Sequence, residues 1–210
     1  MQIRIAPELS AILALGVSVT EDLTVVEREP RLDAPLADAE RRARSARPGD
    51  PAAVRSMYRR VGLDPTKTRP SSEALLRRVT RGESLPRISS LVDICNWCSL
   101  EFQLPYGLYD VDRIAGDVDL RLGREGEQYA GIRKEIVHLT GRLTLADVEG
   151  PFGNPTSDSA RTMVTVNTGR ALFAVFTPKS LVDRLPDVLE RTSQRVKIFC
   201  GGHEVSRNIV

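Results

Sequence analysis

The sequence predicts an α+β domain, with most helices in the first half of the chain and most strands in the second. Apolar residues recur at helical spacing in three segments, 51–62, 71–82 and 89–98. After residue 114 the chain turns to short segments of β-branched and alternating residues, which are typical of strands. The 210 residues contain no repeat and no low-complexity tract, so they are most simply one domain or one domain with extensions.

The composition is that of an ordinary globular protein, with 41% hydrophobic and 28% charged residues. The longest apolar run, Ala11–Val19, is far shorter than the roughly 20 residues that span a bilayer. The first residues do not resemble a signal peptide, and three cysteines do not make a disulfide framework. We therefore expect a cytoplasmic protein with no membrane segment.

The first sixty residues are expected to supply strands and then helices. Residues 3–26 are rich in β-branched and apolar side chains and should form two or three short strands. Residues 36–47 have helical composition with a thin apolar stripe, which indicates an exposed helix that ends at Pro48-Gly49. Asp50 should cap the next helix, whose buried face repeats at helical spacing and comprises Val54, Met57, Tyr58 and Val61.

Two more helices are expected in the stretch that follows. Ser71 is a suitable N-cap for the first, because its hydroxyl can accept a bond from a first-turn amide, and Gly82 closes that helix. The second helix should begin at Ser89 or Ser90, where an S-x-x-D capping pattern occurs. Its residues are apolar on nearly every side, so it should lie inside the core.

The second half is expected to form strands and one last helix. Residues 149–160, which are rich in Gly, Pro, Asn and Ser, are expected to be a loop. The strands expected here are 114–122, 133–147, 161–166 and 171–176. Residues 167–170 should be a hairpin turn between the last two. A last helix should start at Pro178 and be kinked or split at Pro186, followed by a final strand over 195–200 and then the tail.

Positive charge gathers in one part of an otherwise balanced chain. Between Arg55 and Arg87 there are nine cations and three carboxylates, and from Glu101 to Glu127 the sign reverses. Such an excess is either a solvated helix face or a footprint for a phosphate backbone. The candidates for phosphate contacts are Arg69, Arg77, Arg78, Arg81 and Arg87.

Asn96 is the single amide in the otherwise apolar helix that begins near Ser89. Buried without a partner, an amide costs on the order of 1–3 kcal/mol. It should therefore bond either to a backbone corner of the chain or to a ligand.

The corner expected beside Asn96 is Leu104–Asp110. Pro105 removes an amide donor there, and Gly107 lets the backbone approach another group closely. In one alternative Asn96 and Asp110 simply staple this loop. In the other, the corner is one wall of a ligand pocket lined by backbone amides and by Tyr106 or Tyr109.

The usual catalytic motifs do not occur. The sequence has no G-x-S-x-G, no Gly-rich phosphate loop followed by Lys-Ser/Thr and no H-E-x-x-H. Cys95 and Cys98 form C-x-x-C in an apolar helix, where small core fillers are favoured over a metal or redox site. His138 lies in an alternating segment without a neighbouring nucleophile, which favours a structural role. We therefore expect no metal and no cofactor.

Four successive motifs carry a resemblance to a known family. They are Y-x-x-x-G-L-D-P-x-K-x-R-P-S-S-E-A-L-L-R-R-V (58–79), L-P-x-I-x-x-L-V-D-x-x-N (85–96), L-P-x-G-L-Y-D-V-D-x-I-x-G (104–116) and S-D-x-x-R-T-x-V-T-x-x-T (157–168). Together they resemble the B3/B4 domain, the tRNA-binding and editing module of the phenylalanyl-tRNA synthetase beta subunit, and in particular its free-standing relatives. The resemblance is strong over residues 58–176 and loose at both ends.

The resemblance implies a single B3/B4-like domain over 1–210, with a β-barrel-like or mixed sheet core and flanking helices. Its motif-bearing part would be 55–176, with strands and a helix in 1–54 and a helix and a strand in 177–210. Members hydrolyse tyrosine wrongly esterified to phenylalanine tRNA in a pocket between the core and the helices. The implied partner is the acceptor end of an aminoacyl-tRNA.

Carried over by position, the resemblance implicates Asn96, Pro105, Gly107, Tyr109 and the segment Ser157–Thr168. The candidate catalytic residues are Asn96, Asp158, Thr165 and Thr168. Gly107 stands where the bacterial synthetase has a histidine. The family's editing glutamate has no evident counterpart, because the loop before Thr162 offers Asp158, and Glu127 and Glu149 lie elsewhere.

Three functions from different classes follow. The favoured one is a deacylase that removes wrongly attached amino acids, most suitably an aromatic one, from tRNA in trans. The second is a non-catalytic module that binds tRNA or an amino-acid-like ligand. The third is a scaffold on which residues 36–47 and the last helix dock another protein.

Overall fold

The computed structural model describes residues 1–46, 49, 51–133 and 135–210. Within them the α-helices are α1 (Asp33–Ser45), α2 (Pro51–Arg60), α3 (Ser71–Thr80), α4 (Ser90–Phe102) and α5 (Leu185–Cys200). The strands are β1 (Ile3–Ile5), β2 (Leu13–Leu23), β3 (Tyr106–Asp110), β4 (Val118–Leu122), β5 (Gln128–Ala130), β6 (Ile136–His138), β7 (Leu143–Asp147), β8 (Gly150–Gly153), β9 (Ala171–Pro178) and β10 (Gly201–Ile209). None of the helices in the described part of the chain is long and apolar enough to cross a membrane.

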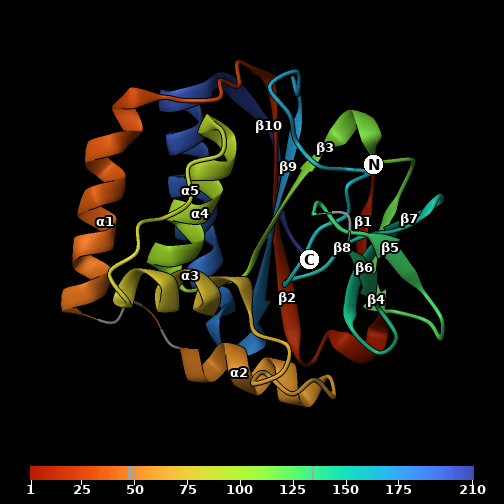
Figure 1. Ribbon diagram of the computed structural model, residues 1–210. Coiled ribbons are helices and arrows are strands. Elements are labelled where there is room, and N and C mark those ends of the chain that lie inside the picture. The colour runs from red at the N-terminus through yellow and green to blue at the C-terminus, as the bar shows by residue number, and fades with distance from the viewer. Residues whose placement is uncertain (47–48, 50, 134) are drawn as a thin grey trace.

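The described elements form three layers, which confirms the α+β class (Figure 1). The central sheet has the order β10-β2-β9-β3 and is antiparallel throughout. Helices α1, α3, α4 and α5 lie on one side of it, and a smaller sheet of order β1-β4-β7-β8 lies on the other. The ribbon β5-β6 adjoins the smaller sheet. The expected core was either a β-barrel-like one or a mixed sheet. The described strands form open sheets, one of them mixed, and close no barrel.

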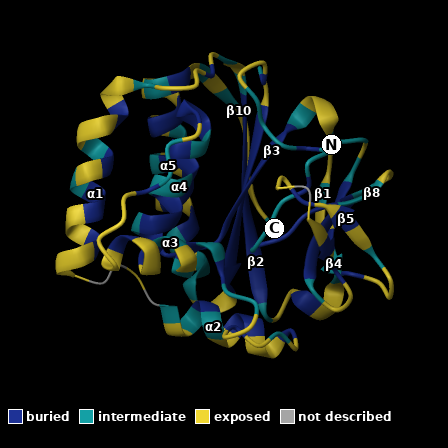
Figure 2. Ribbon diagram, in the orientation of Figure 1, coloured by how far each residue is buried: buried dark blue, intermediate teal, exposed yellow. Residues whose placement is uncertain are grey.

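The core centres on β9, in which every residue from Ala171 to Pro178 is buried. Helices cover one face of this strand and the smaller sheet covers the other, so its sequence is apolar without alternation from Ala171 to Phe176. Figure 2 shows similar burial along β2 and β3 and on the helix faces turned to the sheet, whereas the edge strand β10 is mostly exposed. Each buried Phe or Leu side chain stabilises the fold by about 1.5–3 kcal/mol.

Helix α4 is sunk in the core, as its apolar sequence predicted. Of the two expected starts, Ser89 is the N-cap, and its hydroxyl accepts a bond from the Val92 amide at 3.4 Å. Ser90 instead accepts a bond from the Val26 amide at 3.1 Å. Asp93 accepts from the Ile88 amide at 2.8 Å and pairs with the partly buried Arg87, so the S-x-x-D pattern does not form a capping box.

The start of helix α3 shows that the N-cap role expected for Ser71 is wrong. Pro70 is the N-cap and Ser71 is the first helical residue, so its hydroxyl caps nothing and has no partner among the described residues. At the other end the helix stops at Thr80, and Gly82 takes a left-handed conformation with φ of 90°. The expected stop at Gly82 is therefore confirmed.

Several strand predictions are wrong. Residues 161–166 are irregular and pair with no strand, so the hairpin turn at 167–170 does not exist. The expected corner 104–110 is mostly strand β3, and the loop expected at 149–160 begins with β8. Segment 161–166 has strand propensity, but it follows the free edge of β3, where the Asp110 amide donates to its Thr162 carbonyl at 2.9 Å.

The two ends of the chain also differ from expectation. Residues 3–26 contain one short strand, β1, and one strand of 11 residues, β2. Pro186 lies in the first turn of α5 and the preceding residues form a 3₁₀ turn, so the expected helix is split. Residues 195–200 are the end of α5 and not a strand, because Arg195, Val196 and Cys200 are buried at helical spacing. The final strand is β10, in the predicted tail.

The helices expected at 36–47 and from residue 51 are α1 and α2. Arg47, Pro48 and the predicted cap Asp50 lie outside the described residues. Helix α1 buries a stripe that includes Leu36 and Ala43, while α5 buries an apolar face against α4 and β2. The apolar faces of both helices are therefore used within the domain, which removes the main argument for the scaffold hypothesis.

Candidate functional site

Two glycines make room for the side chain of Tyr109. Gly107 and Tyr109 lie two residues apart on β3 and therefore point to the same face. A Cβ atom at Gly107 or at Gly153 would collide with the Tyr109 phenol. The ring also packs edge-on against Phe152, with 5.0 Å between ring centroids. The close approach expected at Gly107 is thus made by a side chain of the same strand.

The phenol hydroxyl of Tyr109 contacts Asp158, a partly buried residue of the loop after β8. Tyr109 Oη donates a hydrogen bond to Asp158 Oδ1 at 2.8 Å. Burial raises the pKa of Asp158 to about 7, against hydrogen bonds from Tyr109 and from the Asn154 and Leu108 amides that lower it. Near neutral pH this carboxyl is therefore present in both protonation states, as a general acid or base requires.

Asn154 organises the loop that carries Asp158. Its Oδ1 accepts bonds from the amides of Thr156 and Ser157, both at 2.8 Å. Its Nδ2 donates to Tyr129 Oη at 2.8 Å, and Tyr129 Oη donates to the Ser157 carbonyl at 2.5 Å. Sequence reasoning missed both residues. The Asn-Pro dipeptide was the available signal, because it favours the start of a turn.

Two helices hold the same loop from the other layer. The Pro155 carbonyl accepts bonds from Tyr58 Oη on α2 and from the Ser71 amide at the start of α3, each at 3.2 Å. Together with the Tyr109–Asp158 bond, these contacts bring parts of three motif segments, 58–79, 104–116 and 157–168, around one short loop. These contacts place three motifs that are far apart in the sequence around the same loop.

Asn96 is half-buried, and its Nδ2 is buried with no partner among the described residues. The alternative in which Asn96 and Asp110 staple the loop is not what is observed, because Asp110 bonds to Thr168 and to the Asp112 amide. The neighbouring Cys95 lies near the loop: burial raises the pKa of its thiol, and the charges of Cys98 and Asp158 raise it further. Asn96 thus offers a donor that the chain itself does not use.

The other candidates from the sequence serve different roles. Thr168 Oγ1 donates to Asp110 at 2.7 Å and accepts from the Thr165 amide, so both threonines close a turn away from Asp158. Tyr106 points to the opposite face of β3, where its hydroxyl pairs with Thr192 of α5 at 3.0 Å. The Pro105 carbonyl accepts from the Phe176 amide at 3.0 Å. Of the predicted set, Tyr109 contacts both Gly107 and Asp158, and Thr165 and Thr168 contact each other in a separate turn.

The Tyr109 ring fills the space beside Gly107 where a ligand pocket was predicted. Two hollows lie elsewhere. One, of about 400 Å³, is lined by residues of the first and last strands together with Val17 and Val19. The other, of about 230 Å³, lies between α1 and Glu101 of α4. A ligand side chain can occupy the space over Gly107 only if Tyr109 turns away.

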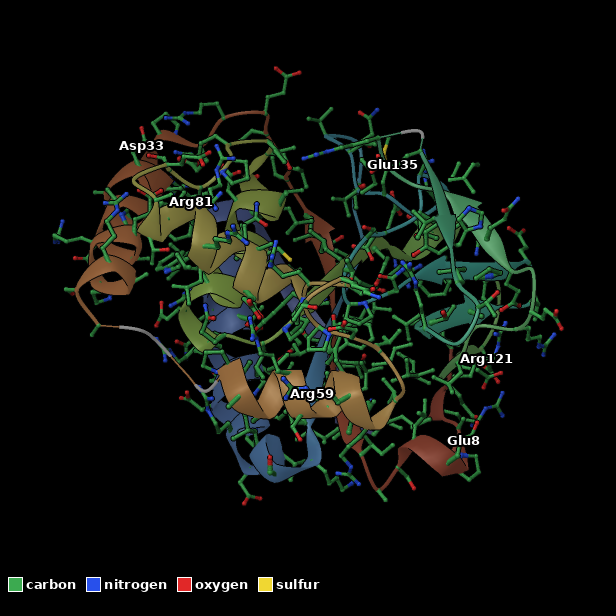
Figure 3. All side chains as sticks on the ribbon, turned by 60° about the horizontal axis from the view of Figure 1, so that its bottom comes forward. Glu8, Asp33, Arg59, Arg81, Arg121 and Glu135 are labelled. Atoms are coloured by element: carbon green, nitrogen blue, oxygen red, sulfur yellow. The ribbon has the colours of Figure 1, made fainter. Side chains whose placement is uncertain are left out.

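The predicted phosphate-binding arginines divide into two groups. Arg87 bridges Asp33 and Asp93, and Arg78 pairs with Glu83 at 3.0 Å, so both have structural partners. Arg69 lies 3.8 Å from Glu73. Arg77 and Arg81 are exposed, and their guanidinium groups form no hydrogen bond or ion pair with the described part of the chain. Figure 3 labels Arg81, just beyond α3 in the helical half of the molecule.

Comparison with known proteins identifies the family. The B3/4 domain model matches residues 53–194, so the chain belongs to the B3/4 domain family. The phenylalanine–tRNA ligase beta subunit of Bartonella quintana is 30% identical over 149 residues, which cover 59% of this chain and 18% of that protein. The corresponding subunit of Paramagnetospirillum magneticum is 33% identical over 90 residues, 37% of this chain and 11% of that protein.

A solved structure shares the fold. It is an N-terminal fragment of the phenylalanyl-tRNA synthetase beta subunit from Pyrococcus horikoshii, with a TM-score of 0.50 and 13% identity. The match covers 97% of this chain and 50% of that one. The chain spans less than a fifth of the length of the curated relatives named above. The resemblance seen in the motifs is therefore confirmed as family membership.

Proposed function

We propose that this protein hydrolyses amino acids wrongly esterified to tRNA, with tyrosine on phenylalanine tRNA as the most suitable substrate. Membership of the B3/4 family and the names of the similar synthetase subunits support a tRNA-related role. The observation that carries the proposal is the convergence of three family motifs on Asp158, a carboxyl that is bonded to Tyr109 and has no cationic partner in the described part of the chain.

Hydrolysis of an aminoacyl ester needs few catalytic groups, because the ester is already activated. Hydrolysis needs a positioned water, a donor for the carbonyl oxygen and room for the side chain. In the proposed reaction Asp158 takes a proton from water as the water oxygen bonds to the ester carbon. The ester C–O bond then breaks and the proton passes to the ribose oxygen, leaving a free amino acid and an uncharged tRNA. The unused Nδ2 of Asn96 is the donor available for the substrate.

Selection of tyrosine over phenylalanine would rest on the phenol hydroxyl. A site that hydrogen-bonds a substrate hydroxyl discriminates strongly, because the analogue without it leaves a buried polar group unpaired. That partner must be a group other than Asp158, because the phenol oxygen of a tyrosyl ester lies too far from the ester carbon for one carboxyl to contact both.

Contacts to the tRNA backbone would come from Arg77 and Arg81. Both are exposed and project from the end of α3, whose first turn adjoins the Asp158 loop. Each phosphate contact steepens the dependence of binding on salt, by roughly 0.7–0.9 in log–log slope. Arg87 provides the matched control for charge, since its guanidinium is already bonded to two carboxylates.

Deacylation of a panel of mischarged tRNAs tests the proposal. We expect release of tyrosine from phenylalanine tRNA by the full chain, and a loss of at least about 100-fold in rate for Asp158→Asn. Asp112→Asn is the control, because Asp112 is an exposed carboxyl at the end of β3 that pairs with Arg170. Equal rates for Asp158→Asn and the unaltered chain would show that this carboxyl has no part in the reaction.

A second candidate is a module that binds tRNA or an amino-acid-like ligand without hydrolysing it. The Tyr109 ring favours it, because that ring fills the space over Gly107 in which a substrate side chain would lie. Salt-dependent tRNA binding with no hydrolysis of any mischarged tRNA would favour this candidate over the first.

A further inference from the structure

The first turn of α3 carries polar groups that the protein does not use. Ser71 Oγ is buried and has no hydrogen-bond partner among the described residues. Arg69 Nε, two residues earlier, is also buried without one, although the side chain as a whole is 35% exposed. Ser72 is only 2% exposed, and its hydroxyl forms no hydrogen bond within the described chain. Three unpaired polar groups thus lie within four consecutive residues.

The backbone of this turn is incompletely bonded as well. Pro70 is the N-cap and offers no side-chain acceptor. The Ser71 amide donates to Pro155 and the Ala74 amide to Pro70, which leaves the amides of Ser72 and Glu73 as the first-turn donors still available. A buried hydroxyl without a partner costs about 1–3 kcal/mol, so a cluster of unused groups at a helix N-terminus calls for an acceptor.

The charge around the turn favours an anion. The carboxylate of Glu73 is the acidic group here, and Arg55 binds it at 2.8 Å. This bond lowers the pKa of Glu73, against burial, and the charges of Arg55, Arg69 and Arg77 lower it further. Three guanidinium groups therefore surround one carboxylate. Arg69 Nε lies 3.8 Å from that carboxylate, too far for a hydrogen bond.

We propose that the first turn of α3 binds a phosphate group, held by the hydroxyls of Ser71 and Ser72, the two available amides and the guanidinium of Arg69. Helix N-termini suit phosphate because their amides and their dipole both favour negative charge. Arginine adds the directional bonds that a tetrahedral anion accepts. The ligand class is a phosphate ester or free phosphate.

The position of the site connects it to the proposed reaction. The Ser71 amide bonds to Pro155, in the loop that carries Asp158, so a phosphate here lies beside the proposed hydrolytic centre. The terminal phosphodiesters of a tRNA acceptor end are suitably close to its esterified amino acid. This assignment of the source rests on the proposed function, whereas binding of phosphate as such does not.

The experiment is a titration of the full isotopically labelled chain, followed by its amide NMR signals. The probes are inorganic phosphate, the uncharged trinucleotide CCA, and a mixture of cytidine and adenosine without phosphate. We expect saturable shifts centred on Ser72 and Glu73 with the first two probes and none with the nucleosides. Tighter binding of CCA than of inorganic phosphate assigns the site to nucleic acid, and equal binding assigns it to free phosphate.

Matched substitutions at the two ends of α3 make the test specific. Ser71→Ala and Arg69→Gln should each weaken binding by about tenfold or more, as expected for a hydrogen bond to a charged group. Thr80→Ala and Arg81→Gln, at the other end, should change it less than about twofold. Ser71→Ala should fold normally, because it removes a hydroxyl that bonds to nothing in the chain.

Absence of saturable shifts with both phosphate probes at millimolar concentration would overturn the inference. So would equal losses of affinity at the two ends of the helix. These failures are distinct from failure of the proposed function, because the titration involves no turnover. A chain that binds CCA through Ser71 but releases no amino acid refutes the deacylase alone. A chain that deacylates with unaltered affinity in Ser71→Ala refutes the phosphate site alone.

Discussion

Two partly buried carboxylates, Glu101 and Asp158, have contrasting surroundings. Glu101 of α4 is bonded to Arg195 at 2.7 Å and also pairs with Arg191 and Arg42. Burial raises the pKa of Glu101, but these guanidinium groups outweigh it, and the pKa is lowered. Asp158 has hydrogen bonds and no cationic partner among the described residues, and burial prevails, raising its pKa to about 7.

The contrast distinguishes a structural charge from a candidate functional one. Arg195 also stacks over the Trp97 ring at 3.7 Å and donates to Cys98 Sγ at 3.3 Å, so the cluster between α4 and α5 is densely paired. A paired cluster specifies how two helices pack. A buried carboxyl left unpaired stores free energy that proton transfer can use, and such groups concentrate at functional sites.

The largest effect is expected at the paired cluster. Arg195→Ala should destabilise the protein by about 3 kcal/mol, because it leaves Glu101 partly buried without its most buried cationic partner and uncovers Trp97. Arg191→Ala, at a position 40% exposed, should cost less than about 1 kcal/mol. Urea unfolding followed by tryptophan fluorescence measures both. Equal values for the two variants would contradict the assignment of Arg195 as the principal partner.

The loop that supports Asp158 should show the next effect. Asn154→Ala removes the acceptor of two amides and the donor to Tyr129, at an expected cost of about 2–3 kcal/mol. Asn154→Asp keeps the acceptor and should recover part of that loss, while its negative charge raises the pKa of Asp158 further. Carboxyl NMR titration measures that shift. An unchanged Asp158 pKa in Asn154→Asp would show that the loop does not set its environment.

The close approach of Tyr109 predicts a smaller loss. Gly107→Ala should destabilise the protein by about 1–2 kcal/mol, because the added methyl group collides with the phenol ring. Gly169→Ala is the control, since a Cβ there meets nothing within 4 Å. Thermal unfolding of the two variants measures the difference in their stability. If Gly107→Ala is as stable as the control, the ring moves aside readily, which would favour substrate entry over Gly107.

The smallest expected effect is a change in the free energy of unfolding whose sign differs between substitutions at Asp158 and at Glu101. A carboxyl with a raised folded-state pKa contributes stability below its unfolded pKa of about 4 and loses it as pH rises through about 7. Asp158→Asn should therefore stabilise the protein by about 1 kcal/mol at pH 8, with no gain at pH 3. Glu101→Gln should destabilise it at neutral pH, because the lowered pKa of Glu101 contributes stability that is lost only on acidification. Unfolding free energies at both pH values test the two signs.

The fold brings some of the residues predicted for the site together and separates others. Gly107, Tyr109 and Asp158 lie in contact, and Asn96 Nδ2 has no partner among the described residues. Tyr106 was placed on the same wall and lies on the other face, because side chains of a strand alternate. That alternation was not applied, since the segment was expected to be a corner and not a strand.

What the sequence by itself determined is local or carried by motifs: the family, the burial of α4, its start at Ser89 or Ser90 and the stop at Gly82. Helices bond within four residues along the chain, so adjacent side chains suffice to predict them. The tertiary structure alone decided that 106–110 is a strand and 161–166 is not, because β3 needs a partner more than sixty residues away. It also decided the unusual pKa of Asp158, since that value depends on burial beneath distant segments and on the absence of a cation within reach.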